Sequence, residues 1–480
     1  MPEPAVPTAL ADLPDPFPIV PLAAPPDALI RVPGGRSITN RALVAAGLAE
    51  GTTVLRGAGT SDDTEAMVDC LRALGAAVDV APAPGGADIT VSGVAGRPGG
   101  GVDVFTRLSG TTSRFVTAVA ALADGPVRVD AAPPMRARPM ADLVVALRAL
   151  GVAVDEEGES GHLPLVVTGP LSGHEVLVPG TVSSQFLSGL LLAAGARPGL
   201  PFRVRLSTDR LVSAPYVAMT AAVMAAYGVE VEGVEVEGVE VEGVEGGANG
   251  DGADAPGRGA LAIGRGGYRA PEAGYDVEPD AATAGYFLAA AAITGGRVTV
   301  PGLPSAGLQA DAELVDVLDA MGATVTRSGR DVTVAGPAAA GGPGGARLRG
   351  GTFDLTAFSD MAPTVAVLAA FAAEPVEVTG VGFIRGKESD RIAASVAELQ
   401  RCGVPARETD DGFVVWPDGR PAGAEPHGAV IRTYDDHRMA MSFALLGLVV
   451  PGVAIADPGC VAKTHPGFFA DLDRLRTPAR

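Results

Sequence analysis

The sequence predicts a mixed α/β (α+β) fold that is built from six repeated units and divided into two or three domains. A chain of 480 residues is too long for a single hydrophobic core. Its 65 glycines and single tryptophan are typical of regular, tightly turned α/β proteins. A short sequence motif that is typical of a helix end also recurs along most of the chain, which indicates an internal repeat.

In the repeated motif, a bulky residue ends a predicted helix and a glycine follows it. A valine-containing segment then begins the next predicted strand. Glycine suits this position because the residue after a helix C-terminus often adopts a left-handed conformation. The glycines lie 76, 77, 94 and 81 residues apart, and a weaker sixth copy lies at residues 472–475. We expect each unit to contain two amphipathic helices and short strands in the order βαβαββ. The five glycines are Gly75, Gly151, Gly228, Gly322 and Gly403.

Two segments fall outside the repeat. Nine of the first 26 residues are proline, so we expect an extended arm that is disordered over residues 1–15. This arm lacks the early positive charge and apolar stretch of a secretory signal. Residues 229–259 lengthen one repeat, beginning with alternating valine and glutamate. Such alternation favours an exposed hairpin, so we expect a surface insertion without a catalytic part.

Composition excludes several classes of function. A net charge of −20 argues against nucleic acid and anionic membranes as partners. Three widely spaced cysteines predict neither a disulfide framework nor a zinc site, and they suit a reduced cytoplasm. The longest apolar run, residues 439–450, is shorter than the roughly 20 residues that span a bilayer, so it predicts a buried helix. A small anionic ligand then requires a local cluster of positive charge.

Such charge is concentrated at six predicted helix starts, where free backbone N–H groups and the helix dipole favour anions. Ser37 and Arg41 lie one turn apart and are expected to face one anion. Gly110 allows a ligand to approach the backbone closely, and Pro139 suits a first helical position. Each start is also consistent with simple capping by Ser, Thr or Asp. The six segments are residues 32–41, 109–114, 135–139, 182–186, 387–391 and 434–441.

Four further residues are candidates for proton chemistry. Asp360 either caps the helix that follows it or acts as a general base, and His437 is either a titrating or a structural group. Only two of the 36 basic residues are lysines, Lys387 and Lys463. Lysine can exchange a proton, whereas arginine is a permanently charged fork. The two lysines are therefore expected where a compact ammonium is needed.

Taken together, the six segments resemble those of the EPSP synthase (3-phosphoshikimate 1-carboxyvinyltransferase) family, over residues 28–475. The resemblance implies an inside-out α/β barrel in each of two domains, with three βαβαββ units per domain. Domain I is expected to comprise residues 16–33 and 278–480, and domain II residues 34–277. The resemblance also implies that the substrates bind in a cleft between the two domains and that the domains close on them.

The resemblance implies transfer of the enolpyruvyl group of phosphoenolpyruvate to the 5-hydroxyl of shikimate 3-phosphate, with release of phosphate. This step belongs to the synthesis of chorismate and the aromatic amino acids. No metal or organic cofactor is implied, and the family default is a cytoplasmic monomer. Because both substrates are polyanions, they account for cationic helix starts in an acidic protein.

The same resemblance implies roles for individual residues. Asp360 would accept the hydroxyl proton, Glu388 would protonate the methylene carbon, and Lys463 would pair with phosphate and relay protons. Shikimate 3-phosphate would contact Arg36, Ser37, Arg41, Ser183, Ser184, Gln185, Ser213, Tyr216, Asp360 and Lys387. Phosphoenolpyruvate would contact Arg36, Gly110, Arg138, Gln185, Arg391, Arg438 and Lys463.

Three positions depart from the family pattern: Arg36 replaces a usual lysine, and Leu108 and Phe383 each replace an asparagine. If that lysine only pairs with phosphate, the change to arginine is mild. If it acts as an acid, its loss costs roughly 10²–10⁴ in rate. These departures motivate an alternative, a catalytically weak paralogue that binds the ligands. A second alternative is the related enzyme that adds enolpyruvate to UDP-N-acetylglucosamine. That enzyme carries a reactive cysteine in a mobile loop, and no cysteine lies near the Gly110 or Arg138 loops.

Overall fold

The computed structural model divides the chain into two compact units. Unit 1 comprises Met1–Pro33 and Glu278–Arg480, and unit 2 comprises Gly34–Val277. The structure describes residues 10–83, 85–179, 183–207, 214–233, 260–304, 307–337, 347–417 and 426–477. Ser213 and most of the expected insertion, from residue 234 to 259, lie outside these ranges, as do residues 1–9.

Among the described residues each unit contains three sheets, and all six share one pairing pattern. One pair of strands is parallel, and the other neighbours are antiparallel. In unit 2 one complete repeat runs β6 (Val102–Phe105), α3 (Gly110–Ala120), β7 (Val127–Asp130), α5 (Ala141–Ala149), β8 (Ala153–Glu156), β9 (Leu165–Thr168). This order is the predicted βαβαββ unit.

Unit 1 repeats the pattern in the sheet β17-β18-β20-β19, with β17 and β18 parallel. Its elements are β17 (Gly351–Asp354), α10 (Ala362–Ala369), β18 (Val376–Thr379), α11 (Arg391–Arg401), β19 (Ala406–Glu408) and β20 (Phe413–Val415). The third sheets are smaller. They are formed by β10 (Glu175–Val178), β11 (Phe202–Leu206) and β12 (Ala260–Ile263), and by β1 (Phe17–Pro18), β22 (Ala454–Ile455) and β21 (Val430–Ile431).

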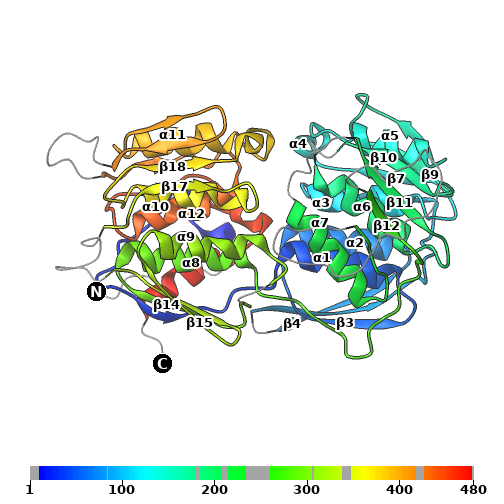
Figure 1. The fold of residues 1–480 in the computed structure, drawn as a ribbon, viewed down its shortest axis with the longest axis horizontal. Helices are drawn as coiled ribbons and strands as arrows, with labels where there is room; N and C mark the ends of the chain where they lie inside the picture. The colour runs from blue at the N-terminus through cyan, green and yellow to red at the C-terminus, as the bar shows by residue number, and fades with distance from the viewer. Residues whose placement is uncertain are drawn as a thin grey trace, which may run out of the picture. The chain divides into compact units, whose positions relative to one another are not determined.

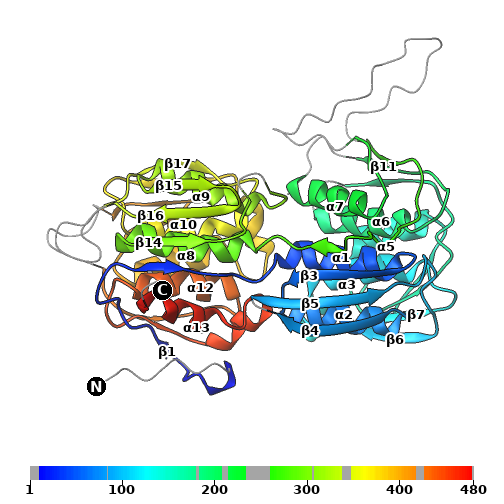
Figure 2. The same ribbon diagram turned by 90° about the horizontal axis from the view of Figure 1, so that it is seen from below.

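The remaining sheet of each unit takes its edge strand from a distant part of the chain. In unit 2, β13 (Tyr275–Asp276) pairs in parallel with β3 (Thr52–Ala58). In unit 1, β2 (Asp27–Leu29) pairs in parallel with β14 (Arg297–Val300). Figure 2 shows β3, β5 (Gly86–Ser92) and β4 (Ala77–Ala83) side by side. The other sheet is completed by β15 (Thr324–Ser328) and β16 (Asp331–Ala335).

Three mutually contacting helices form the centre of each unit. In unit 1 these are α8 (Ala281–Thr294), α10 and α12 (His437–Gly447), which lie between the sheet of β17 and β18 and the sheet of β14 and β15 (Figure 1). Every residue of α8, α10 and α12 is buried. In unit 2 the corresponding helices are α1 (Arg36–Leu48), α3 and α6 (Ser184–Gly195).

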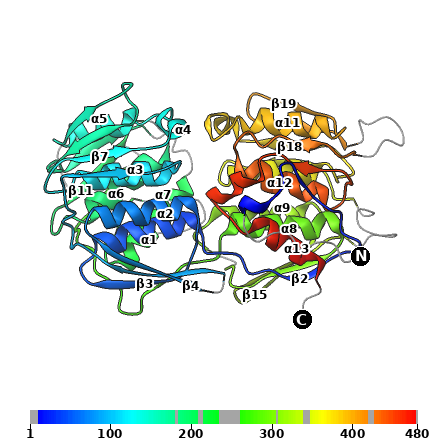
Figure 3. The same ribbon diagram turned by 180° about the vertical axis from the view of Figure 1, so that it is seen from behind.

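The expectation of two amphipathic helices per unit is therefore wrong for the first helix of each repeat. A helix that is apolar all round is surrounded by protein, whereas an amphipathic helix keeps one face in solvent. The second helices, such as α2 (Asp62–Ala73) and α11, do bury one face only. Figure 3 shows α2 beside the buried α1. The predicted buried helix within residues 439–450 is confirmed as α12.

The repeated glycines end the second helices, as predicted. The five lie after α2, α5, α7 (Ala214–Ala226), α9 (Leu314–Ala320) and α11. All five adopt positive φ angles, from 74° at Gly403 to 100° at Gly75. This left-handed conformation is the one that glycine adopts without steric cost, so the repeat rests on backbone geometry.

Three local expectations need correction or addition. Residues 10–15 are ordered, because Leu10–Asp12 form a 3-10 turn and the Asp15 carboxylate accepts a 2.9 Å bond from the Asp457 N–H. Pro139 is not a first helical residue, since α5 begins at Ala141 after a separate short helix, α4 (Pro133–Arg136). No helix within the described ranges is long and apolar enough to span a membrane.

Candidate active site

The predicted helix starts are confirmed at five of the six segments. Helix α1 begins at Arg36, α3 at Gly110, α6 at Ser184, α11 at Arg391 and α12 at His437. Four of these helices have a side-chain cap that accepts a backbone N–H: Ser109, Ser183, Asp390 and Asp436. Capping fixes the local chain, so the charged side chains that follow each cap have defined positions.

Arg391 is the centre of the site in unit 1, and its side chain is 1% exposed. Its Nη1 donates to Asp360 at 2.8 Å, and its Nη2 donates to Glu388 at 2.9 Å. Its Nε donates to Asp436 at 2.7 Å. Burial disfavours the guanidinium charge, but Asp436, Glu388 and Asp360 outweigh it and raise the pKa of Arg391. Arg391 is thus a permanently charged fork that joins three carboxylates.

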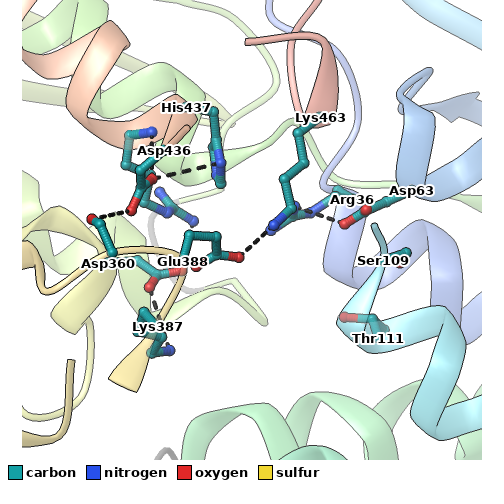
Figure 4. A network of polar contacts seen from close by, with 12 residues as sticks. Arg36, Asp63, Ser109, Thr111, Asp360, Lys387, Glu388, Asp436, His437 and Lys463 are labelled. Carbon is teal, nitrogen blue, oxygen red and sulfur yellow. Dashed lines mark hydrogen bonds and ion pairs between the residues drawn. The ribbon is translucent and has the colours of Figure 1, made fainter. Parts of the chain in front are cut away.

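Asp360 is a partner of cations and does not cap a helix. The N-cap residue of α10 is Met361, which makes no side-chain capping bond. Asp360 accepts from Arg438 Nη2 at 2.6 Å. Lys387 Nζ lies 3.6 Å from Asp360 Oδ1 (Figure 4). Burial alone would raise the pKa of Asp360, yet Arg438, Lys387 and Arg391 hold it well below its usual range. The group is therefore ionised.

Each of the two lysines lies against a carboxylate. Lys387 approaches Asp360, as given above, and Lys463 Nζ donates to Glu388 Oε1 at 2.6 Å (Figure 4). The Lys463 and Glu388 side chains are 13% and 17% exposed, so their contact is largely desolvated. A short lysine–carboxylate bond at low exposure allows a proton to pass between the two groups.

Asp436 connects these side chains to α12. Its Oδ1 accepts from the Arg438 backbone N–H at 2.9 Å, and its Oδ2 also accepts from Ser389 Oγ at 3.0 Å. Arg438 Nη1 reaches the Tyr286 hydroxyl at 3.3 Å, and burial raises the pKa of Tyr286 to about 12. His437 is buried, with Nδ1 3.7 Å from Asp436 Oδ1, so it is packed inside the site.

Arg41 is the corresponding buried cation of unit 2, at 1% exposure. Among the described residues its guanidinium donates to neutral oxygens: Thr220 Oγ1 at 2.7 Å, Ser37 O at 2.9 Å, Tyr216 O at 3.2 Å and Ser188 Oγ at 3.5 Å. Burial lowers the pKa of Arg41 to about 10. A buried cation held by neutral oxygens is suited to binding an anion.

Arg36 has a different environment, because Nη1 donates to Asp63 Oδ2 at 2.9 Å. Asp63 is 3% exposed, and its backbone oxygen accepts from Thr112 Oγ1 at 3.1 Å (Figure 4 shows Arg36 beside Asp63). Asp63 therefore ties the arginine of α1 to the start of α3. Arg36, which replaces the lysine usual in the family, therefore lies beside the buried carboxylate of Asp63.

Gly110 lies against two arginines. A Cβ atom at this position would be 3.0 Å from Arg138 Nη1 and 3.2 Å from Arg114 Nη1. Arg114 Nη1 donates to Gln185 Oε1 at 2.5 Å, and Gln185 Nε2 donates to Thr111 Oγ1 at 3.3 Å. The starts of α3 and α6 and the Arg138 loop therefore meet in unit 2. Ser183 and Ser184 open α6 beside Gln185.

The sequence-predicted residues thus fall into two groups. Unit 1 brings together Asp360, Lys387, Glu388, Arg391, Arg438 and Lys463. In unit 2 contacts join Ser37, Arg41 and Tyr216, and Gly110 lies against Arg138. Asp63 and Tyr286 lie outside the six predicted segments, whereas Arg114 and Asp436 lie inside them but were assigned no role. The signal for Asp63 and Asp436 was present, since each lies at a Ser- or Asp-capped helix start.

The three thiols are unsuited to nucleophilic chemistry. Burial raises the pKa of Cys70 and Cys460 to about 12 and that of Cys402 to about 11. The thiolate is the reactive form, so these cysteines are inert at neutral pH. Within the described ranges no group of three or more His, Cys, Asp or Glu side chains is arranged to hold a metal ion.

The chain is similar to known proteins over most of its length. A protein from Nostoc punctiforme named 3-phosphoshikimate 1-carboxyvinyltransferase is 39% identical over 451 residues, covering 93% of this chain and 96% of the relative. A protein of that name from Thiobacillus denitrificans is 40% identical over 442 residues, covering 92% and 95%.

Among solved structures, an EPSP synthase from Acinetobacter baumannii has the same fold, with a TM-score of 0.75 at 24% identity and coverage of 96% and 98%. The enolpyruvyl transferase NikO from Streptomyces tendae gives a TM-score of 0.68 at 18% identity and coverage of 96% and 98%. The model of one family, described as EPSP synthase (3-phosphoshikimate 1-carboxyvinyltransferase), matches residues 24–255 and 257–472. The chain therefore belongs to the EPSP synthase family.

Proposed function

We propose that this protein transfers the enolpyruvyl group of phosphoenolpyruvate to the 5-hydroxyl of shikimate 3-phosphate, giving 5-enolpyruvylshikimate 3-phosphate and phosphate. One observation carries the proposal: Arg391 binds two separate carboxylates, Asp360 and Glu388, each beside its own lysine. Addition followed by elimination needs one group that takes a proton and another that gives one. Relatives of that name, at 39% and 40% identity over most of the chain, support the same reaction.

Asp360 is the proposed base. Its low pKa keeps it as a carboxylate, but this also makes it a weak base while Arg391 and Arg438 hold it. If the carboxylate or phosphate of phosphoenolpyruvate binds these arginines, Asp360 loses part of their stabilisation. Its pKa then rises, so the base becomes stronger when the substrate is in place.

Glu388 and Lys463 are the proposed acid and its proton source. The hydroxyl oxygen bonds to C2 of phosphoenolpyruvate while C3 takes a proton from Glu388, which forms the tetrahedral intermediate. The C2–O bond to phosphate then breaks, and C3 returns a proton to Glu388. Lys463, 2.6 Å from Glu388, supplies the proton that Glu388 gives to C3 and takes it back after the elimination. It also pairs with the departing phosphate, which takes up the proton that Asp360 accepted from the hydroxyl.

The remaining residues are proposed to bind the two anions. Arg41 is the strongest candidate for the phosphate of shikimate 3-phosphate, because within the described ranges it donates to neutral oxygens. The other proposed contacts of shikimate 3-phosphate are Arg36, Ser37, Ser183, Ser184, Gln185, Ser213, Tyr216, Asp360 and Lys387. The proposed contacts of phosphoenolpyruvate are Arg36, Gly110, Arg138, Gln185, Arg391, Arg438 and Lys463.

By the same family resemblance we propose a cytoplasmic protein that works as a monomer without a metal or organic cofactor. We further propose that its two domains are residues 16–33 with 278–480 and residues 34–277. Sedimentation of the purified protein, with and without both substrates, tests the oligomeric state. A dimer at micromolar concentration would contradict the monomer.

A phosphate-release assay tests the function. Purified protein should release phosphate only when both shikimate 3-phosphate and phosphoenolpyruvate are present. The control is Asp360→Asn, which keeps the side-chain shape but removes the base. Release with phosphoenolpyruvate alone would contradict transfer and indicate hydrolysis.

A catalytically weak, ligand-binding paralogue is the second candidate. It is favoured by Arg36, which occurs where the family usually has lysine and is already paired with Asp63. For such a paralogue, shikimate 3-phosphate would raise the melting temperature while both substrates together released no phosphate.

A further inference from the structure

The turn that leads into α12 has an unusual backbone. Tyr434 and Asp435 both have φ of 56°, although neither is glycine. Side chains rarely adopt this left-handed conformation, and a tyrosine does so less readily than an aspartate. Two such residues in succession persist only where surrounding contacts hold them.

Glu398 supplies these contacts from helix α11. It is 0% exposed, and its Oε1 accepts from the Tyr434 hydroxyl at 2.8 Å. Its Oε2 accepts from the Arg432 backbone N–H at 3.2 Å. Arg401 Nε also donates to Oε2, at 2.8 Å, and balances the buried charge. One buried carboxylate thus binds the turn at two points.

This turn also determines the position of Asp436, the residue that follows it. The Asp436 backbone N–H donates to Thr433 O at 2.9 Å, which closes the turn. The Asp436 carboxylate then accepts from Arg391 Nε at 2.7 Å. Arg391 is the first residue of α11, and Glu398 belongs to the same helix. The contacts therefore form a closed ring: Arg391, α11, Glu398, Tyr434, Asp436 and back to Arg391.

We propose that Glu398 is a positioning residue for the reaction, which holds the Tyr434–Asp435 turn so that Asp436 orients Arg391. Glu398 does not touch Arg391 or the reacting groups, so its effect passes through the turn. The inference rests on the proposed function, because it assigns Glu398 to the arginine that would bind phosphoenolpyruvate.

A purely structural role for Glu398 is the competing explanation. A buried carboxylate that pairs with Arg401 contributes to stability wherever it lies. The two explanations differ in what a small change does. Tyr434 is 40% exposed, so loss of its hydroxyl should disturb packing little while it removes one of the two bonds to the turn.

The experiment compares Tyr434→Phe and Glu398→Gln with matched controls. Tyr268→Phe removes a buried tyrosine hydroxyl that donates to Leu192 O at 3.0 Å in unit 2. Glu374→Gln changes an exposed carboxylate that accepts from the Gly350 N–H at 2.8 Å. For each protein the measurements are the melting temperature and KM and kcat for each substrate.

We expect Tyr434→Phe to raise KM for phosphoenolpyruvate roughly ten-fold, because a small misplacement of a binding arginine has large effects. Its KM for shikimate 3-phosphate should stay within about two-fold of wild type, and Glu398→Gln should show the same split. Tyr268→Phe should lower the melting temperature as much as, or more than, Tyr434→Phe, because it loses a buried hydrogen bond. Neither control should change either KM.

Two results would overturn the inference. In the first, Tyr434→Phe has wild-type kinetics; in the second, both KM values and kcat change together and follow the melting temperature across all four variants. The proposed function is judged separately, by wild-type turnover with both substrates. If wild type shows none, the function fails before the variants are compared.

Discussion

Lys463 donates a 2.6 Å hydrogen bond to Oε1 of Glu388, while Arg391 donates a 2.9 Å bond to Oε2 of the same carboxylate. In the proposed mechanism Lys463 exchanges protons with Glu388, and Arg391 supplies a fixed positive charge. Lysine can release a proton, whereas arginine remains charged. This arrangement accounts for a lysine at position 463 in a chain that otherwise uses arginine almost throughout.

The first prediction concerns Lys463. Lys463→Arg keeps the positive charge but removes the exchangeable proton, so kcat should fall by roughly 10²–10⁴. Steady-state phosphate release measures this loss, and Lys463→Met shows the effect of removing both charge and proton. If Lys463→Arg retains most of wild-type kcat, the lysine provides charge only.

The second prediction concerns Asp360 and pH. Because its pKa is lowered in the fold, Asp360 stabilises the protein above its unfolded pKa of about 3.9, and this contribution is lost as pH falls through the lowered value. Asp360→Asn should therefore unfold more easily than wild type between pH 5 and 8. The difference should shrink below about pH 4. Urea titrations at several pH values measure it, and a difference that grows on acidification would contradict the charge network.

The third prediction concerns Gly110. A Cβ there would lie 3.0 Å from Arg138 Nη1 and 3.2 Å from Arg114 Nη1, so Gly110→Ala should displace the ends of these side chains. KM for phosphoenolpyruvate should rise roughly ten-fold, because a binding group moves. Gly264→Ala is the matched control, since a Cβ at Gly264 meets nothing within 4 Å. Equal kinetics for the two variants would show that Arg138 does not bind this substrate.

The fourth prediction concerns Arg41. Shikimate 3-phosphate should raise the melting temperature of wild type, because a ligand that binds the folded state stabilises it. Arg41→Met should abolish this rise, since it removes a buried cation that donates to neutral oxygens among the described residues. Thermal shift with and without ligand gives the measurement. An unchanged ligand-induced shift would place the phosphate elsewhere.

The fifth prediction concerns Arg36. Its guanidinium is held by Asp63 at 2.9 Å, which indicates a charge with a fixed position. Arg36→Lys should therefore change kcat by less than about ten-fold, below the range of a lost acid or base. Asp63→Asn should raise both KM values by releasing Arg36. A gain in kcat above 100-fold for Arg36→Lys would show that arginine impairs the site.

The sequence was sufficient for the repeat and for most helix starts. Glycines such as Gly75 and Gly403 identify helix ends because few other residues adopt their positive φ angles, and Ser109 or Asp436 identify helix starts because they cap them. These signals are local, and local chemistry decides them. The fully buried helix α8 was not anticipated, since its surroundings come from α10 and α12, far along the chain.

Pairings between distant side chains could not be predicted either. Asp63 lies 27 residues from Arg36, and Asp436 lies 45 residues from Arg391. Such contacts follow from the packing of helices, which a single sequence does not specify. For the same reason the sequence left open whether Asp360 caps the following helix or pairs with cations. Only the fold brings Arg391 and Arg438 to Asp360.

The central claim is that the protein transfers the enolpyruvyl group to shikimate 3-phosphate, and ¹³C NMR tests it most directly. Phosphoenolpyruvate labelled at C2 is incubated with purified wild-type protein and shikimate 3-phosphate, and the labelled carbon is followed. The account predicts that the labelled C2 signal moves to an enol ether on the shikimate ring as phosphate appears in equal amount. Labelled pyruvate as the product, or no change while shikimate 3-phosphate still raises the melting temperature, would contradict it.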